Sequence, residues 1–264
     1  MSSAASPSGE LASRFRLDGR VALVTGAGRG IGRSAAIALG EAGAEVWLLA
    51  RTASEIEQAA AEIRAAGGSA HAVACDVTDA ASINRVVAAV PVLDVLVNNA
   101  GMNIPQPFIE VSEANLDRVL GLNVRAMFIV AQAAVRKMLE NPERKTRGGA
   151  IINITSQMGH VGAPTRTVYC VTKHAIEGLT KALAVELAVH NIRVNSIAPT
   201  FLDTPMTAPM FARPEFAKWV LDRIPMGRLG RLDEVAAAVV FVASDAASLM
   251  TGTSLVIDGG WTAQ

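Results

Sequence analysis

The only tyrosine of the chain, Tyr169, lies four residues before Lys173 in a segment of helical period. On one helix this spacing puts both side chains on the same face, about 6 Å apart along the axis. Ser156 comes thirteen residues before the tyrosine, where an apolar run ends. A phenol with a pKa of about 10 is a weak base at neutral pH, and a nearby ammonium lowers that pKa. The three side chains indicate proton transfer at an oxygen, although a Tyr-x-x-x-Lys pair by itself also occurs as an ordinary structural feature.

A glycine-rich turn follows the first apolar run, where residues 25–32 read TGAGRGIG and open an alanine-rich segment. Its glycines at 26, 30 and 32 allow a tight turn, close approach of the backbone to a pyrophosphate, and close packing of the helix on a sheet. The helix N-terminus offers free N–H groups and the positive end of its dipole to an anion. Because the turn stands between a first strand and a first helix, it predicts a dinucleotide site.

The end of the second apolar run bears on which dinucleotide binds. A carboxylate there accepts from the ribose hydroxyls of NAD, whereas a cation favours the 2′-phosphate of NADP. The sequence has Arg51 at this point, and Arg29 in the glycine turn can approach the same phosphate from the other side. We expect NADP(H) to be favoured and NAD(H) to remain possible, since both arginines also fit an ordinary surface.

Short apolar runs alternate with longer alanine-rich segments from residue 20 onward, which is typical of βα units around a parallel sheet. Near-continuous apolar strands fit burial on both faces by crossover helices. The predicted fold class is α/β: a Rossmann-type doubly wound fold with a seven-stranded parallel sheet, helices on both faces and a single domain. The expected strands are 21–25, 45–49, 70–75, 94–99, 150–155, 192–197 and 254–258. The expected helices are roughly 30–42, 54–66, 79–89, 112–139, 167–189, 214–222 and 232–243.

Two irregular stretches interrupt the alternation. Residues 141–149 are polar and end in glycine, so we expect a solvated turn without chemistry. Residues 199–228 carry five prolines and three methionines, and a connection of this length in a compact domain is usually a lid or a binding segment. We therefore expect a flexible arm over residues 1–17 and one dinucleotide-binding and catalytic domain over 18–264, with a substrate lid at about 200–228.

Composition excludes several classes of protein. The chain has 264 residues with 24 basic and 24 acidic side chains, so no overall field attracts nucleic acid or anionic lipid. Cys75 and Cys170 are too few for a disulfide framework or a zinc site, which fits a reducing cytoplasm and no metal. No run approaches the roughly 18 consecutive apolar residues of a membrane span. The Ser-rich start lacks the apolar block of a signal peptide, with an organellar transit segment as the alternative.

Further motifs accompany the glycine turn and the Ser, Tyr and Lys set, in a consistent order along the chain. They are Asp76-Val77, Asn98-Asn99-Ala100-Gly101, Asn123 and the segment IAPTFLDT at 197–204. With these motifs the sequence resembles the short-chain dehydrogenase/reductase family from about Asp18 to Trp261.

The resemblance implies that Tyr169 is the general acid/base on the substrate oxygen and that Ser156 hydrogen-bonds the same oxygen. It implies that Lys173 lowers the pKa of the phenol and binds the nicotinamide ribose, and that Asn123 holds a water linking Lys173 to solvent. Together with the turn and the two arginines, the expected cofactor contacts are Gly26, Gly28, Arg29, Gly30, Ile31, Arg51, Asp76, Val77, Asn99, Ala100, Gly101, Tyr169, Lys173, Pro199, Leu202 and Thr204.

One position departs from the family pattern, which has glycine after Pro199 where this chain has Thr200. A β-branched residue tolerates a positive φ poorly. Either the backbone differs locally, or the position needs no glycine and the side chain narrows the substrate pocket. The candidate substrate contacts are Gln157, Met158, Thr200 and Met206, with His160 as a weaker one.

The predicted function is NAD(P)(H)-dependent interconversion of a small secondary alcohol and a ketone, with Tyr169 as general acid/base. A 3-oxoacyl thioester reductase of the same family is the alternative. A Rossmann-fold methyltransferase leaves Ser156 and the Tyr-Lys pair unexplained, and a non-catalytic dinucleotide-sensing regulator needs none of the four catalytic side chains that this chain has. The resemblance further implies a homotetramer, built on segments 112–139 and 167–189 and on the C-terminal SLVIDGGW.

Overall fold

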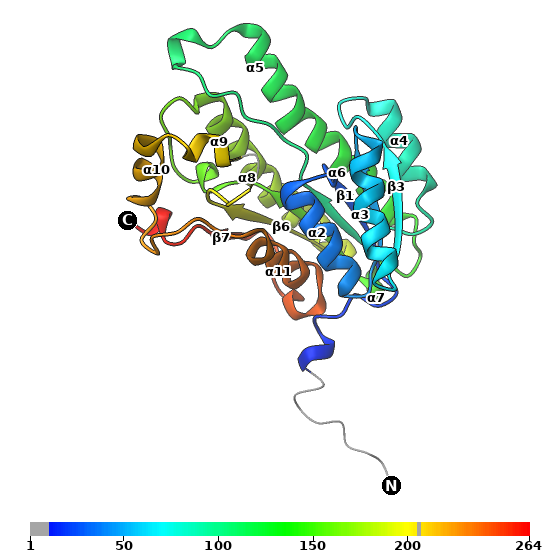
Figure 1. Ribbon diagram of the computed structural model, residues 1–264. Coiled ribbons are helices and arrows are strands. Elements are labelled where there is room, and N and C mark those ends of the chain that lie inside the picture. Colours follow the sequence, from blue (N-terminus) through cyan, green and yellow to red (C-terminus); the bar gives the residue numbers. More distant parts are fainter. Residues whose placement is uncertain (1–10, 205–206) are drawn as a thin grey trace.

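A computed structural model describes residues 11–204 and 207–264, and in this part of the chain seven parallel strands form one sheet (Figure 1). The strand order is β3-β2-β1-β4-β5-β6-β7. The bounds are β1 (Val21–Thr25), β2 (Glu45–Ala50), β3 (Ser69–Ala74), β4 (Val95–Asn98), β5 (Gly149–Ile154), β6 (Ile192–Pro199) and β7 (Ser254–Ile257). The predicted α/β doubly wound fold is confirmed, and each expected strand is present to within two residues at either end.

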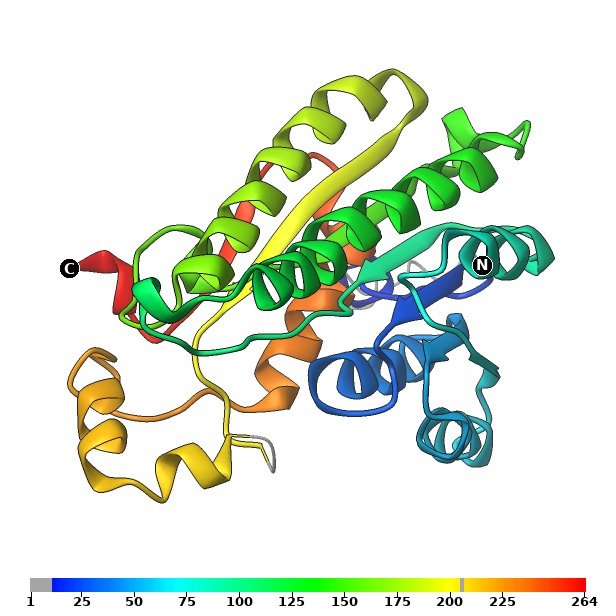
Figure 2. The same cartoon turned by 90° about the horizontal axis from the view of Figure 1, so that it is seen from above.

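Helices cover both faces of the sheet (Figure 2). One face carries α2 (Gly30–Glu41), α3 (Ala53–Ala65) and α11 (Leu232–Ala243), and the other carries α4 (Ala80–Ala89), α6 (Met127–Leu139) and α8 (Thr167–Leu187). Successive side chains of a strand point to opposite faces. Ala22 and Val24 of β1 therefore join the first helix layer, while Leu23 between them joins the second. This double burial explains the near-continuous apolar strands.

The helix expected over 112–139 contains an irregular turn. Ser112 caps α5 (Glu113–Leu120) by accepting from the N–H of Asn115, and the π-helical turn η2 (Gly121–Ala126) leads into α6. By length and composition alone, Glu113–Leu139 is apolar enough to cross a membrane. The apolar side of α6 packs on the sheet, however, and core helices of soluble proteins pass the same test.

The prediction that residues 141–149 form a solvated turn is wrong in one respect. The segment contains the short helix α7 (Arg144–Arg147), and Arg144 is buried. Its guanidinium donates to Asp94, which is fully buried just before β4, and Arg147 binds the same carboxylate. The segment therefore supplies two cations to a buried carboxylate at the amino ends of the central strands.

The expected lid and arm both contain ordered contacts. Beyond β6 lie α9 (Ala208–Phe211) and α10 (Pro214–Leu221), which pack with Phe201 and Trp261 in a small apolar cluster. Residues 1–10 of the expected arm lie outside the described residues. In the remainder of the arm, Leu17 is buried and Arg14 exchanges hydrogen bonds with the segment 245–248.

Candidate active site

The predicted catalytic residues lie beyond the carboxyl ends of the central strands. Ser156 follows β5, Tyr169 and Lys173 lie one turn apart on α8, and Asn123 lies in η2. The chain reverses its direction of winding between β3 and β4, which places a switch point between β1 and β4. In open α/β sheets ligands bind in the crevice outside the strand ends at such a point.

Direct contacts bring the Ser, Tyr and Lys side chains together. The Lys173 ammonium lies 5.4 Å from the centre of the Tyr169 ring and donates to the carbonyl of Ile154 at 2.9 Å. The Ser156 hydroxyl interacts with the Tyr169 phenol and donates to Oε1 of Gln157 at 2.7 Å. Two hydroxyl groups therefore adjoin a single position, where both can hydrogen-bond a substrate oxygen.

The pKa of Tyr169 is raised, whereas the sequence led us to expect that Lys173 would lower it. Burial raises this pKa to about 12, although the neighbouring Ser156 hydroxyl and the charge of Arg166 act in the opposite direction. The Lys173 ammonium donates to the Ile154 carbonyl rather than to the phenol. The phenol is thus protonated at neutral pH, the state that a proton donor to a carbonyl oxygen requires.

A buried carboxylate that the sequence analysis missed lies behind the lysine. Glu177 follows Lys173 by one helical turn, and burial leaves it 6% exposed. Its two oxygens accept from Thr155 at 2.6 Å, Ser196 at 2.6 Å and Ser254 at 3.1 Å. Its charge raises the pKa of Lys173 against the larger lowering effect of burial. The helical spacing of 169, 173 and 177 was the signal that could have revealed it.

Burial of Lys173 gives a measurable pH dependence of stability. Burial lowers its pKa from 10.5 to about 8, which corresponds to about 3 kcal/mol. Between pH 8 and 10.5 the unfolded chain keeps a proton that the folded protein has released, so the free energy of unfolding rises with pH. Relative to Lys173→Met, wild type should gain about 2 to 3 kcal/mol over this range in urea unfolding. Parallel pH curves for the two proteins would show that the lysine is not desolvated.

Asn123 joins three segments around the site. Its Oδ1 accepts from the N–H of Met102, and its Nδ2 donates to the carbonyl of Met102 and to Thr172, all within 3.1 Å. Both amide hydrogens are therefore engaged, and the residue is fully buried. A relay water at Asn123 would therefore hydrogen-bond to its main-chain carbonyl or to the second lone pair of Oδ1. π-helical turns of this kind are frequent at functional sites.

The glycine turn forms a cradle that fits a dinucleotide phosphate. A Cβ on Gly32 would lie 2.3 Å from the carbonyl oxygen of Gly26, and one on Gly26 would lie 2.8 Å from Nδ2 of Asn99. Gly30 has φ +56° and open space in front of it. The close contacts require glycine, and the open position at the start of α2 leaves room for an anion at the helix N-terminus.

Charged side chains surround the expected adenosine end of this cradle. Arg29 and Arg51 are exposed, and neither forms an ion pair with any described residue. Glu55 lies over the turn, because a Cβ on Gly28 would come within 2.6 Å of its Oε2. Sequence analysis missed Glu55, whose carboxylate reaches the turn only because α3 packs beside α2.

The segment after β4 adjoins the cradle. Nδ2 of Asn99 donates to the carbonyl of Thr25 at 2.9 Å, and the N–H of Ala100 donates to the Thr25 hydroxyl at 3.1 Å. Gly101 lies against the Asn123 side chain. After β3, Val77 is buried and the Asp76 carboxylate accepts from the N–H and the hydroxyl of Thr78. The carboxylate of Asp76 is therefore already engaged within its own turn.

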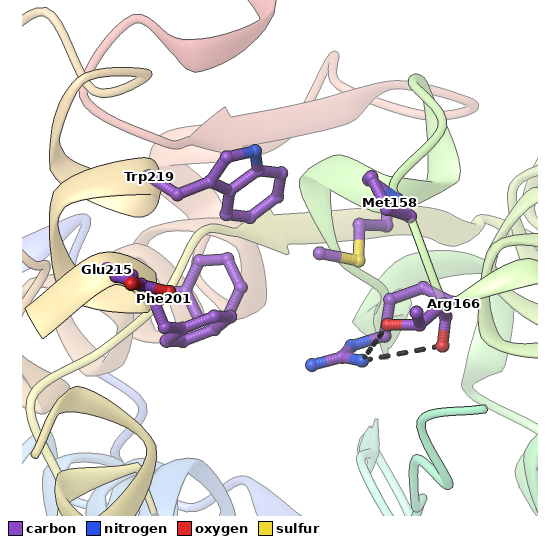
Figure 3. Close-up of a pocket in the computed structure, with 8 residues that line it drawn as sticks. Met158, Arg166, Phe201, Glu215 and Trp219 are labelled. Atoms are coloured by element: carbon purple, nitrogen blue, oxygen red, sulfur yellow. Dashed lines mark hydrogen bonds between the residues drawn. The ribbon is translucent and has the colours of Figure 1, made fainter. Parts of the chain in front are cut away.

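A cavity of about 280 Å³ lies between the loop after Ser156 and a wall that Phe201 and α10 contribute (Figure 3). It is lined by Met158, Pro164, Thr165, Arg166, Phe201, Glu215, Phe216 and Trp219. Of the candidate substrate contacts, Met158 lines it, whereas Gln157 and Thr200 do not. Met206 lies outside the described residues. Sequence analysis missed Arg166, whose position in the cavity depends on the fold of the loop before α8.

Thr200 needs no glycine-like backbone. In the described residues, the non-glycine positions with positive φ are Thr165 and Asn191. The N–H of Thr200 donates to the carbonyl of Ile257 at 3.1 Å and so extends the pairing of β6 with β7, while its hydroxyl is buried without a partner. Beyond it, Leu202 is buried and forms a bridge to Gly230.

The remaining histidine candidate is part of the Glu177 network. His160 has its Nε2 2.9 Å from the Ser254 hydroxyl and 3.4 Å from Glu177. In the part of the chain that the structure describes, no group of three or more His, Cys, Asp or Glu side chains could hold a metal ion.

Comparisons with known proteins agree with this geometry. A family model described as enoyl-(acyl carrier protein) reductase matches residues 26–262. The L-xylulose reductase of Bos taurus is 40% identical over 251 residues, which cover 94% of this chain and 99% of that protein. A solved short-chain type dehydrogenase/reductase from Mycobacterium marinum has a TM-score of 0.88 and 36% identity, over 96% of this chain and 100% of that one.

A second solved structure carries a bound cofactor. It is a gluconate 5-dehydrogenase from Burkholderia cenocepacia in complex with NADP and tartrate, with a TM-score of 0.89 and 35% identity over 97% of this chain and 99% of that one. Sequence identity above 30% over nearly the whole length accompanies the same overall fold. The chain therefore belongs to the short-chain dehydrogenase/reductase family, and it is an oxidoreductase that acts on CH–OH groups.

Proposed function

We propose that this enzyme is an NADPH-preferring reductase of a small ketone, which it converts to the secondary alcohol. The observation that carries the proposal is the protonated Tyr169 phenol beside the Ser156 hydroxyl. The nicotinamide, when bound, supplies the hydride that adds to the carbonyl carbon. The phenol donates the proton to the carbonyl oxygen, and the serine hydroxyl hydrogen-bonds that oxygen as its negative charge develops.

We propose that the other two catalytic candidates, Lys173 and Asn123, position the cofactor and the loops around the site. We assign the Lys173 ammonium to the nicotinamide ribose hydroxyls, since it is a buried donor on the same helix face as Tyr169. We propose that Asn123 holds the loop after β4 against α8 and that it also binds a relay water. In the cofactor cradle, the glycine turn receives the pyrophosphate, and the segments at 76–77, 99–101 and 199–204 flank the adenosine and nicotinamide ends.

Arg51 and Arg29 support a preference for NADP, and Glu55 opposes it. Arg51→Asp should shift the binding ratio of NADP⁺ to NAD⁺ toward NAD⁺ by about 1 to 3 kcal/mol, because a charge-assisted hydrogen bond is lost and a repulsive charge is gained. Isothermal titration with the two oxidised cofactors measures this without turnover. Glu55→Gln should shift the ratio the other way, and an unchanged ratio in Arg51→Asp would exclude Arg51 as the discriminating residue.

The relatives do not identify which small ketone this enzyme reduces. L-xylulose is a neutral sugar and gluconate is an acid, and the proteins named for them are similarly distant from this chain. A panel of ketones, neutral ketoses and a 3-oxoacyl thioester, each with NADPH, tests the proposal directly. Oxidation of NADPH by a simple ketone or ketose supports the proposed reduction, preference for the thioester supports the alternative, and no turnover with any of these compounds contradicts both.

We propose that the enzyme works as a homotetramer in the cytoplasm. Exposed apolar side chains support an interface on α6, α8 and the β7 end of the sheet: Phe128, Leu139, Val171, Val185, Leu249 and Val256. Exposed apolar patches of this kind mark association surfaces in soluble proteins. Light scattering of the purified enzyme measures the assembled mass.

A further inference from the structure

The cavity beside the Ser156 loop has an aromatic wall and one buried cation. Phe201 and Trp219 lie on one side with Phe216 packed against both, and the Arg166 guanidinium lies across the space from Phe201 and Trp219 (Figure 3). Arg166 is the residue that precedes α8, three positions before Tyr169, and it is 7% exposed. The cavity adjoins the catalytic residues, because Met158 follows Ser156 by two residues and Arg166 directly precedes the helix that carries Tyr169.

The guanidinium has few partners for a buried cation. Its Nη1 donates to the hydroxyl of Thr165 at 2.8 Å and more weakly to the carbonyl of the same residue at 3.4 Å. No carboxylate of the described residues forms an ion pair with it, and Nε and Nη2 donate to no described acceptor. Burial of a charge without a counter-ion is unfavourable. An anion in the cavity would remove that cost.

The residue that binds the Arg166 side chain has a strained backbone. Thr165 has φ +57°, a left-handed conformation that is costly for a β-branched residue. Its carbonyl accepts from the N–H of Gln106 at 3.1 Å, which secures the strained turn from a neighbouring loop. Strained residues that the surrounding structure maintains cluster at ligand sites. Here the strained residue supplies both protein acceptors of the Arg166 side chain.

One further cation and one carboxylate lie near the Arg166 guanidinium. Arg213 adds positive charge that lowers the pKa of Arg166, after the larger effect of burial. Glu215 lines the cavity, but it forms no ion pair with Arg166. One planar guanidinium with two open donors matches the two oxygens of a carboxylate.

We propose that Arg166 binds a carboxylate of the substrate, so that the enzyme reduces an oxo acid whose apolar segment lies against Phe201, Phe216 and Trp219. The inference rests on the proposed ketone reduction and adds the identity of the group at the far end of the substrate. Arg166 lies only three residues before Tyr169, at the start of the same helix. The carbonyl and the carboxylate of the substrate should therefore be separated by a short carbon chain.

The test compares acids with esters of the same shape. We expect wild type to reduce 4-oxopentanoate or 5-oxohexanoate with a higher kcat/KM than the corresponding methyl ester. Arg166→Met should lower kcat/KM for the acid by about 10- to 100-fold and leave the ester nearly unchanged, as expected for a lost charge-assisted hydrogen bond. Arg166→Lys, which keeps the charge without the planar fork, should recover part of the loss. The matched control is Arg223→Met, since Arg223 stacks on Trp219 from outside the cavity.

Binding supplies a second readout. With saturating NADP⁺ no reduction occurs, so quenching of Trp219 fluorescence reports the affinity of the acid, and Trp219→Phe identifies the signal. Equal affinity of wild type and Arg166→Met for the acid, or equal losses for acid and ester, overturns the carboxylate assignment. If neutral ketones are reduced and acids are not preferred, the assignment fails while the proposed function stands. If no ketone of either kind is reduced, the proposed function itself fails.

Discussion

Tyr169→Phe removes ketone reduction while leaving NADP⁺ affinity within a few-fold of wild type. The phenylalanine ring retains the packing of the tyrosine but has no proton to donate, and a positioned general acid contributes about 10²- to 10⁴-fold to the rate. We expect a fall in kcat/KM of about 10³-fold in steady-state assays with NADPH. This is the largest effect on activity that we expect from a single substitution.

The phenol also sets a direction for the pH dependence. Because burial raises the pKa of Tyr169 to about 12, reduction has its proton donor at neutral pH, whereas alcohol oxidation needs the phenolate and should accelerate as pH rises. Tyr169→Phe should lose this acceleration. A variant that melts at a much lower temperature, or that no longer binds NADP⁺, would instead show that the tyrosine is structural.

Asp94→Leu produces the largest loss of stability that we expect. The Asp94 carboxylate is fully buried, and it accepts from Arg147, Arg144 and the N–H of Val21. Removal of one partner of a buried ion pair costs about 3 to 5 kcal/mol, because the remaining charge is left uncompensated. Arg144 remains buried in the variant, so urea unfolding at fixed protein concentration should give a loss in this range.

An exposed pair provides the control for this substitution. Lys218 on α10 and Asp222 just after it lie 2.7 Å apart in solvent, and Asp222→Ala should cost less than about 1 kcal/mol. Burial raises the pKa of Asp94, but the hydrogen bonds and charges of Arg147 and Arg144 outweigh it and hold that pKa below 3.8. The difference between wild type and Asp94→Leu should therefore persist above pH 4 and shrink as the pH falls below it. Equal costs for the buried and the exposed aspartate would contradict the role of this cluster.

Local patterns in the sequence were sufficient to predict the strands, helices and glycine turn that position the site. Apolar runs and helical periods predicted the strands, because burial on both faces leaves a repeating signature. The glycine turn and the Tyr169–Lys173 spacing were readable for the same reason: each depends on residues a few positions apart. Such patterns do not record which side chains lose contact with water.

The amino-acid sequence by itself determined the doubly wound fold and the glycine cradle, and it singled out Tyr169 as the candidate acid/base. Only the tertiary structure decided the direction of the Tyr169 pKa, the burial of Arg144 beside Asp94, and the placing of Arg166 in the cavity opposite Phe201 and Trp219. Each of these depends on surface that distant segments cover: the ends of β1 and β4 for Asp94, the segment around α10 for Arg166, and the whole site for the phenol. Desolvation is a property of the assembled fold, so no local spacing can report it.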